Sequence, residues 1–240
     1  MSVYSFNILS LSSEQSVYDK NLKYGYLARY FTPVTQSKQN PFMTVEEYRN
    51  LTYSPNILNY KEGTSNAIDF FIFGMKKFLD HILELHNEQN AILIPVPSSK
   101  AKNDPFYNNQ PKNKNLDAPP LRKRNRDNRN IIFVNRICES DNKYKCVEGI
   151  HRISSKKEKE RIPIEDYISD LEIRHTEELN GKCVILIDDI KTHGTTFEAC
   201  SKLVDSHATP SLLITIAIGQ TRSHESFKNE RKEILEPDFF

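Results

Sequence analysis

The sequence predicts an α/β fold with a parallel sheet and helices on both of its faces. Three short apolar runs, at 91–97, 183–187 and 212–218, are continuous rather than alternating, which is typical of strands buried on both sides. Helices are expected between and before them, over 65–88 and 195–206. Because strands that alternate with helices along a chain form parallel sheets, this order indicates the α/β class.

The elements of the first half each have a local signal. Over 65–88, apolar residues recur at spacings of three and four, and Ser65 or Thr64 can cap the helix N-terminus. The run at 91–97 ends in proline, so it is expected to be a buried strand that enters a turn. The stretch 98–130 is polar and rich in Asn, Lys, Arg and Pro, which predicts a long loop. The apolar positions of the helix are Ile68, Phe71, Ile72, Met75, Phe78, Leu79 and Ile82.

The second half continues the alternation. A helix is expected over 127–138, and a polar, charged loop over 154–161. A turn or short helix followed by a strand is expected over 162–173. The strongest strand of all, 183–187, is expected to end where two acidic residues follow it.

Length and composition limit the classes of protein to consider. The chain has 240 residues and a mass of 27.9 kDa, which fits one α/β domain with an extension, or two small domains. Its formal net charge of +1 excludes a globally basic nucleic-acid binder. The sequence has no signal-peptide pattern and no apolar run of membrane-spanning length, so the expected location is cytoplasmic, without a membrane partner. The four cysteines form no CxxC pair and are expected to be reduced thiols.

One local basic cluster keeps nucleic-acid binding open. Several cations close together attract backbone phosphates. No aromatic residues are interleaved with the cluster, so stacking on single strands has little support, and a solvated loop is the favoured interpretation. The cluster consists of Arg122, Lys123, Arg124, Arg126 and Arg129.

The segment 184–196, VILIDDIKTHGTT, combines a strand, two acids and a small-residue turn before a helix. Gly194 lets the backbone come close to a bound group, and the amides of a helix N-terminus suit a phosphate monoester. Asp188 and Asp189 would repel a phosphate and fit better as acceptors for the two hydroxyls of a ribose. A ribose 5-phosphate carries both neighbouring hydroxyls and a phosphate, so it suits the acid pair and the turn together. The structural alternative is an acidic turn whose threonines only cap a helix.

This segment resembles the phosphoribosyl-pyrophosphate (PRPP) signature of the type I phosphoribosyltransferases, where four apolar residues, two acids and two mostly apolar residues precede a Thr- and Gly-containing turn. The resemblance implies that family's parallel-sheet fold. It also implies that Asp188 and Asp189 hold the ribose hydroxyls and are catalytic together with Arg161. His193 departs from the pattern, because the family usually has Thr or Ser there, and this bears on affinity and its pH dependence. The resemblance assigns PRPP binding to Asp188, Asp189, Thr192, His193, Gly194, Thr195 and Thr196.

Two further segments resemble parts of the same family. The run PVPSSK at 95–100 is similar to the strand and loop of ComF-type phosphoribosyltransferase-like proteins, which implies that Ser98, Ser99 and Lys100 bind pyrophosphate. The segment 154–161 falls where the family has a mobile loop that closes over the site. The candidates for contact with the departing pyrophosphate are His151, Arg152, Lys157 and Arg161.

The resemblance implies an enzyme that transfers a ribosyl 5-phosphate from PRPP to a nitrogenous base or nucleotide and releases pyrophosphate. Mg²⁺ is expected to be held through PRPP rather than by protein ligands. The alternative is a non-catalytic PRPP- or nucleotide-binding regulatory or accessory protein of the ComF type, associated with DNA uptake. The expected divisions are an N-terminal extension of unknown role at 1–55, a phosphoribosyltransferase-like domain at 56–225 and a C-terminal tail at 226–240. A homodimer is left open.

Overall fold

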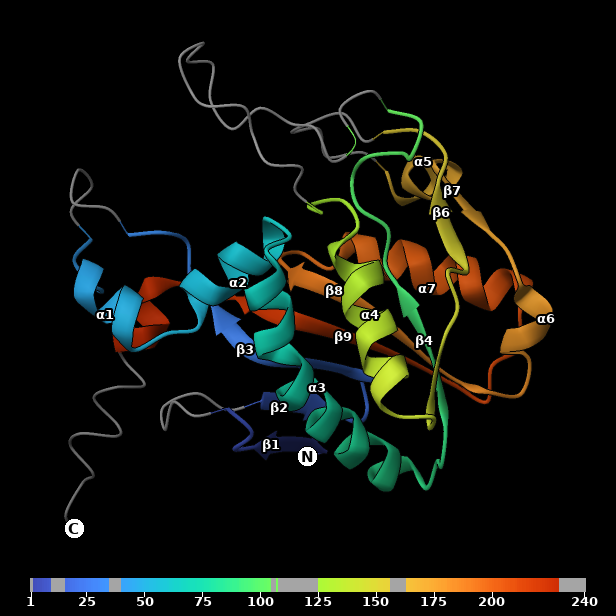
Figure 1. The fold of residues 1–240 in the computed structure, drawn as a ribbon, viewed down its shortest axis with the longest axis horizontal. Helices are drawn as coiled ribbons and strands as arrows, with labels where there is room; N and C mark the ends of the chain where they lie inside the picture. Colours follow the sequence, from blue (N-terminus) through green and yellow to red (C-terminus); the bar gives the residue numbers. More distant parts are fainter. Residues whose placement is uncertain are drawn as a thin grey trace.

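A seven-stranded sheet runs through the computed structural model, which describes residues 2–9, 16–34, 40–104, 107, 125–155 and 163–228 (Figure 1). In spatial order its strands are β1 (Val3–Phe6), β2 (Ser16–Asp19), β3 (Tyr24–Tyr30), β9 (Leu212–Thr221), β8 (Cys183–Lys191), β4 (Ala91–Pro95) and β5 (Tyr144–Cys146). A separate antiparallel pair is formed by β6 (Ile150–Arg152) and β7 (Leu171–Ile173). The helices are α1 (Val45–Asn50), α2 (Ser54–Lys61), α3 (Ser65–His86), α4 (Arg129–Ser140), α5 (Ile164–Ser169), α6 (Thr176–Leu179) and α7 (Thr195–His207).

The strand directions confirm the α/β class. Five neighbouring strands, from β3 through β9, β8 and β4 to β5, pair in parallel, whereas β1 and β2 are antiparallel at one edge. Parallel neighbours need crossover connections, and α4 and α7 supply two of them. The result is a mixed sheet that is mostly parallel.

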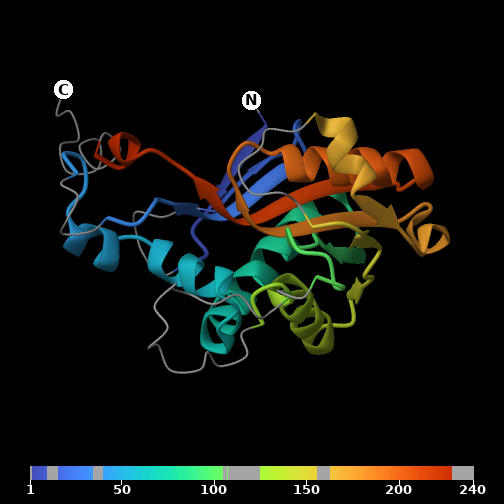
Figure 2. The ribbon, with the colours of Figure 1, turned by 90° about the horizontal axis from the view of Figure 1, so that it is seen from above.

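Helices cover the sheet on both faces, as Figure 2 shows. On one face, α2, α3 and α4 pack against alternate residues of β8, such as Ile185 and Ile187. On the other face, α5 and α7 pack against the intervening residues, Val184 and Leu186. Burial on both sides explains why this strand is apolar at consecutive positions.

The predicted helices and strands are present, with different ends, whereas most of the loops predicted over 98–130 and 154–161 lie outside the described residues. The long helix ends at His86, where the left-handed conformation of the next residue, Asn87 (φ 56°), terminates it, and the helix predicted over 127–138 is α4. The short helix and strand predicted over 162–173 are α5 and β7. The prediction that the strongest strand ends at the acid pair is wrong. Strand β8 continues to Lys191, because its parallel pairing with β9 extends as far as Gln220.

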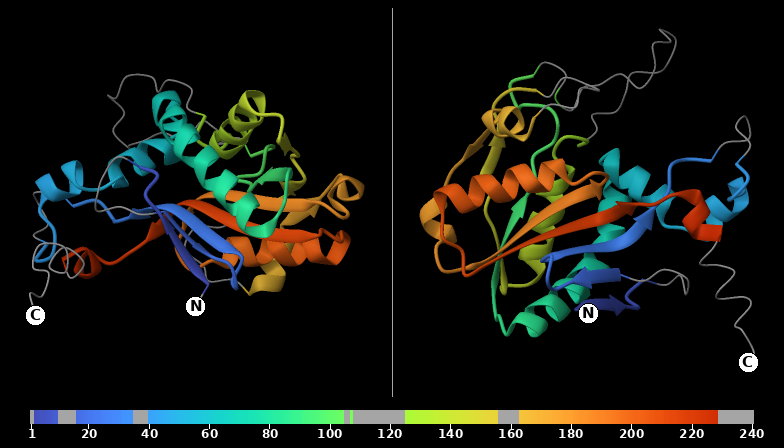
Figure 3. Two further views of the ribbon diagram at one scale, coloured as in Figure 1. Left: turned by 90° about the horizontal axis from the view of Figure 1, so that it is seen from below. Right: turned by 180° about the vertical axis from the view of Figure 1, so that it is seen from behind.

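The first thirty residues contribute to the central sheet. Strand β3 pairs in parallel with β9 from Tyr24 to Tyr30, and β1 and β2 extend the sheet beyond it (Figure 3). The segment assigned to an extension of unknown role therefore supplies three strands. A small cluster that contains Phe31, Met43 and Phe227 joins this region to the last described residues. Within the described ranges, no helix is long and apolar enough to cross a membrane.

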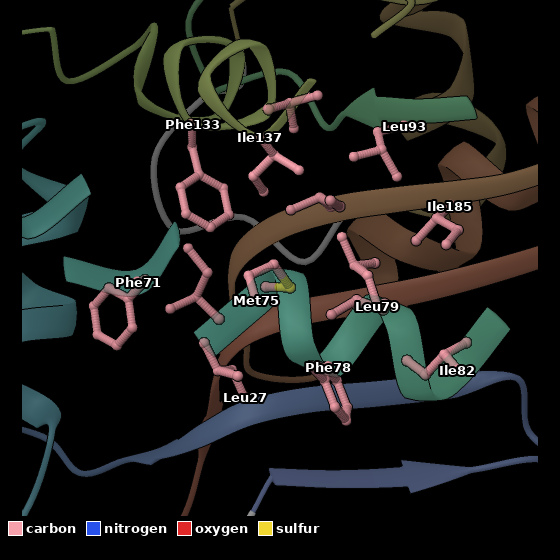
Figure 4. Close-up of a cluster of buried hydrophobic side chains, with 14 of the residues drawn as sticks. Leu27, Phe71, Met75, Phe78, Leu79, Ile82, Leu93, Phe133, Ile137 and Ile185 are labelled. Carbon is pink, nitrogen blue, oxygen red and sulfur yellow. The ribbon is translucent and has the colours of Figure 1, made fainter. Parts of the chain in front are cut away.

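The main core lies between α3 and the sheet (Figure 4). Phe71, Met75, Phe78 and Leu79 of this helix are fully buried there. Gly25 of β3 allows the helix to approach closely, since an added Cβ would lie 2.9 Å from the Phe78 ring. The amphipathic pattern of the sequence thus corresponds to a real packing face.

We expect Leu79→Ala to lower the free energy of unfolding by about 2–5 kcal/mol, because it leaves a cavity in a closely packed core. The matched control is Leu22→Ala, at a residue that is 72% exposed, and it should change stability by no more than about 0.5 kcal/mol. Urea denaturation measures both. Equal effects of the two substitutions would contradict this description of the core.

Candidate functional site

Two neighbouring strands, β8 and β4, carry polar residues at their carboxyl ends. Asp188 and Asp189 lie in β8 and are only 8% and 6% exposed. The amide of Val96, just after β4, donates to the Ile187 carbonyl at 2.9 Å, so the loop after β4 starts beside the acid pair. The crevice beyond the carboxyl ends of parallel strands is where α/β sheets bind ligands.

Asp188 is held by a buried amide. The Nδ2 of Asn130 donates to Asp188 Oδ1 at 3.1 Å and to the Val96 carbonyl at 3.0 Å. The Tyr60 hydroxyl donates to Asn130 Oδ1 at 3.0 Å, and the Asp189 amide donates to Asp188 Oδ1 at 2.7 Å. These bonds tie α4, α2 and the loop after β4 to the end of β8.

Asp189 forms a buried ion pair with the first residue of α4. Arg129 donates to Asp189 Oδ2 through Nε at 3.0 Å and through Nη2 at 2.7 Å. The other carboxylate oxygen accepts from the Ile190 amide at 2.7 Å. Arg129, expected in a basic patch on a solvated loop, therefore lies inside the molecule. Of that cluster, Arg122, Lys123 and Arg124 are outside the described residues.

The pKa values of the two carboxyl groups are shifted in opposite directions. Burial, and next the charge of Asp189, raise the pKa of Asp188 well above the ordinary value for aspartate. Burial alone would also raise the pKa of Asp189, but the positive charges of Arg129 and Lys61 and the hydrogen bonds from Asp188 and the Ile190 amide together outweigh it, so the pKa of Asp189 is lowered. The pair therefore favours one ionised carboxylate, on Asp189.

The turn between β8 and α7 is open to solvent. Gly194 has φ +88°, a conformation that suits glycine, and it precedes the first turn of α7. Thr192 and His193 are exposed, while Thr195 and Thr196 are half-buried. No side chain among the described residues caps this helix N-terminus. Its amides are therefore available to a ligand.

The end of β8 carries one further cation, which the sequence interpretation did not single out. Lys191 Nζ lies 3.4 Å from the centre of the Tyr24 ring, and burial lowers its pKa. The Tyr24 hydroxyl donates to Gln220 Oε1 at 2.6 Å, which links β3 to the end of β9. A Cβ on Gly194 would lie 3.0 Å from Lys191 Cε, so this lysine also packs against the turn.

The three residues expected to bind pyrophosphate differ in exposure. Ser98 is buried, and its hydroxyl bonds within the loop to the amide and carbonyl of Lys100, each at 3.1 Å. Ser99 is exposed. The ammonium group of Lys100 lies 3.5 Å from the carboxylate of Asp104. The Ser98 hydroxyl therefore shapes the loop, while Ser99 is exposed to solvent.

Arg152, one of the candidates for pyrophosphate contact, links this loop to the start of α7. It is 6% exposed, and its Nε donates to the Ser98 carbonyl at 2.7 Å. Its Nη2 donates at 2.9 Å to the hydroxyl of Tyr167, whose ring it overlies, and that hydroxyl lies 3.0 Å from Thr196 Oγ1. Its Nη1 is buried and has no hydrogen-bond partner within the described residues. Lys157 and Arg161, which were expected beside it, lie outside those residues.

A pocket of about 390 Å³ opens beside the acid pair rather than over it. The loop after β4, the start of α4 and the β6–β7 pair form its walls, and Ser98, Lys100, His151 and Arg152 are among its lining residues. The acid pair and the turn at 192–196 do not line it. The structure thus groups the expected site residues into two neighbouring parts that share the loop after β4.

Carboxylates that could hold Mg²⁺ are present in both parts of the site. Asp188 and Asp189 already accept hydrogen bonds at the end of β8, and Asp127, Glu148 and Glu172 line the pocket. A different cluster, His175 with Glu177 and Glu178, precedes the amino end of β8, at the opposite end of that strand. Its groups are mostly exposed, and it bears on no ligand in the crevice.

The opposite pKa directions predict opposite pH dependences for two matched substitutions. Asp188→Asn removes a carboxyl whose pKa is raised by folding, so it should stabilise the fold increasingly as the pH rises above 3.8, by about 1–3 kcal/mol near neutral pH. Asp189→Asn leaves the Arg129 charge buried and unpaired, so it should cost about 3–5 kcal/mol at neutral pH and less in acid. Denaturation at about pH 5 and about pH 8 measures both. Effects of the same sign would contradict the assignment.

Asn130, Tyr60 and Tyr167 complete the site and were not expected from the sequence. They hold Asp188 and Arg152 in place, and nothing in their local sequence marks them. Comparison of the chain with family models and with curated proteins finds no match in either.

Proposed function

We propose that this protein binds PRPP with Mg²⁺ and transfers its ribosyl 5-phosphate to a nitrogenous acceptor, on a fold of the type I phosphoribosyltransferase kind. The observation that carries the proposal is the carboxyl end of β8. There, two buried aspartates, a glycine at φ +88° and an uncapped helix N-terminus occupy one continuous segment. Carboxylates suit hydroxyl donors, and helix amides suit a phosphate.

The 5-phosphate would bind at the turn 192–196. The uncapped amides at the start of α7 point toward this turn, and the hydroxyls of Thr195 and Thr196 lie at the same helix end. His193 is exposed and can add a positive charge when it is protonated. A phosphate bound here receives hydrogen bonds from backbone and side chains together.

The ribose hydroxyls would be bound by the acid pair. The ionised carboxylate of Asp189 has about four lone-pair positions, and hydrogen bonds in the protein occupy only part of them. Asp188 Oδ1 accepts from Asn130 Nδ2 and from the Asp189 amide, and its carboxyl group is also hydrogen-bonded to the Asp189 side chain. Asp189 would become available in full only if Arg129 moved aside, so ligand binding is expected to compete with this ion pair.

The pyrophosphate would lie along the loop after β4. The orphaned Nη1 of Arg152 supports an anion at this position, because a buried guanidinium N–H without an acceptor is costly. The exposed residue Ser99 and the ammonium of Lys100 lie on the same loop. Mg²⁺ would reach the site on PRPP oxygens, where it neutralises charge on the leaving group. In the transfer, a bond forms from the acceptor nitrogen to C1 of the ribose as the bond from C1 to the pyrophosphate oxygen breaks.

A second candidate is a non-catalytic protein that senses PRPP or a nucleotide. The Arg129–Asp189 ion pair favours it, because a ligand that displaces Arg129 would shift the start of α4. Pyrophosphate release separates the two candidates. The enzyme releases pyrophosphate with at least one base from a panel of purines and pyrimidines, whereas the sensor binds PRPP and releases none.

Thermal unfolding in the presence of PRPP and Mg²⁺ tests the binding site itself. A ligand at a thousand times its dissociation constant should stabilise the wild-type protein by about 4 kcal/mol. The double variant Asp188→Asn, Asp189→Asn should keep a cooperative transition and lose this stabilisation. The control is Asp205→Asn, at an exposed acid of α7, which should retain it. An unchanged shift in the double variant, or no shift in the wild type, would contradict the proposal.

Substitution of Arg152 tests the position of the pyrophosphate. Arg152→Met should weaken PRPP binding by about 10- to 100-fold, because it removes hydrogen bonds from a charged group. It should leave the affinity for ribose 5-phosphate nearly unchanged. The control is Arg174→Met, since this residue also lines the pocket but is paired with Glu172. An equal loss for both ligands in the Arg152 variant would place the anion elsewhere.

A further inference from the structure

One buried hydroxyl joins the two parts of the site. The hydroxyl of Tyr167 accepts from Arg152 Nη2 at 2.9 Å and lies 3.0 Å from Thr196 Oγ1. Arg152 belongs to β6, Tyr167 to α5 and Thr196 to the first turn of α7, so three elements meet at this oxygen (Figure 1). Arg152 lines the pocket, whereas Thr196 lies beside the turn at the end of β8. Tyr167 therefore contacts both parts at once.

The direction of Arg152 Nη1 depends on this hydroxyl. A guanidinium group is planar and carries its N–H donors in a fixed fork, so two hydrogen bonds set the direction of the remaining donors. The Nε group is bonded to the Ser98 carbonyl at 2.7 Å and Nη2 to Tyr167. The Nη1 group, which has no acceptor among the described residues, is thereby held in one orientation. Without the hydroxyl, Nη2 would lose this acceptor and the fork could turn about Nε.

The same hydroxyl orients the side chain of Thr196. Burial raises the pKa of Tyr167 above its ordinary value, so the phenol stays protonated at neutral pH. Because a guanidinium group only donates, the phenol proton does not point at Arg152 and can be donated to Thr196 Oγ1. A threonine hydroxyl that accepts in this way has its own proton left for another acceptor. Thr196 then presents a donor at the uncapped end of α7.

Tyr167 itself has little freedom to move. Its side chain is 3% exposed, and its ring centre lies 4.8 Å from the central carbon of the Arg152 guanidinium. It belongs to the buried cluster between α7 and the sheet, together with Phe197 and Cys200. A side chain that is fixed in this way holds its two partners at a constant separation.

We propose that Tyr167 is a positioning residue, which holds Arg152 Nη1 toward the pyrophosphate and the Thr196 hydroxyl toward the 5-phosphate of one bound PRPP molecule. This inference rests on the proposed function and adds a residue that touches neither phosphate group. PRPP carries anionic groups at both ends of its ribose, so donors that are already held at a fixed separation favour it over ligands with one such group. The Tyr167 hydroxyl thus contributes to the affinity at both ends.

Tyr167→Phe tests this role, because it keeps the ring and removes only the hydroxyl. In isothermal titration calorimetry, it should weaken the binding of ribose 5-phosphate and of pyrophosphate with Mg²⁺ by about three- to tenfold each. Arg152→Met should weaken pyrophosphate alone, since it leaves the bond between Tyr167 and Thr196 in place. The control is Tyr144→Phe, at another buried tyrosine, whose hydroxyl donates to Asp80 of α3 at 2.8 Å. The control should change neither affinity.

A double-mutant cycle separates positioning from a general loss of structure. In a Thr196→Val background, Tyr167→Phe should have no further effect on ribose 5-phosphate, because the hydroxyl acts there through Thr196. A general loosening of the fold would weaken binding in both backgrounds. If Tyr167→Phe alone does not fold, it is combined with Arg152→Met, which removes the guanidinium that has lost its acceptor. The double variant should then bind ribose 5-phosphate about three- to tenfold more weakly than Arg152→Met alone.

The results distinguish this inference from the proposed function. A wild-type protein that binds neither PRPP, ribose 5-phosphate nor pyrophosphate overturns both. If the wild type binds all three, an unchanged affinity for either half of PRPP in folded Tyr167→Phe overturns the positioning role alone. A loss of ribose 5-phosphate affinity that persists in the Thr196→Val background has the same consequence, as does an unchanged affinity in the double variant with Arg152→Met.

Discussion

The burial of two consecutive acidic residues at the end of β8 is the constraint on which the arrangement of the site depends. The buried charge of Asp189 is tolerated only when it is paired, and the buried carboxyl group of Asp188 only when it is hydrogen-bonded. The first two residues of α4 meet this need, since Arg129 pairs with Asp189 and Asn130 bonds to Asp188. The start of α4 therefore has to lie against the end of β8. Because Asn130 also bonds to the Val96 carbonyl, the loop after β4 is held there too.

The same hydrogen bonds limit how strongly the acid pair can bind the hydroxyls of a ligand. An acid pair that faced solvent would be free to accept two hydroxyls at once, but these carboxylates already receive donors from α4 and from the backbone. A ligand gains from them only what exceeds the bonds already present. Binding at this end of the sheet is thus coupled to the position of α4.

The sequence predicts the local elements better than their neighbours. The helical spacing of Phe71, Met75 and Phe78 and the continuous run before Asp188 are local signals, and both elements are present. The addition of β3 beside β9 joins residues nearly two hundred positions apart, and no local pattern reports such a pairing. Arg129 shows the same limit. Its basic neighbours indicated a solvated loop, whereas its ion pair depends on a distant strand end.

The two parts of the site differ in whether their buried hydrogen-bonding groups all have partners. Around the acid pair, each charged group has a partner, so this part is stable without a ligand. On the pocket side, Arg152 is buried and bonded through Nε and Nη2, yet its Nη1 has no acceptor in the described structure. A buried donor without an acceptor lowers the stability of the fold, so its presence needs an explanation other than folding. Through Tyr167 the same side chain reaches Thr196 at the start of α7. An anion that met Arg152 would therefore act on both loops at once, which makes the pocket side the place where a ligand changes the energetics of the site most.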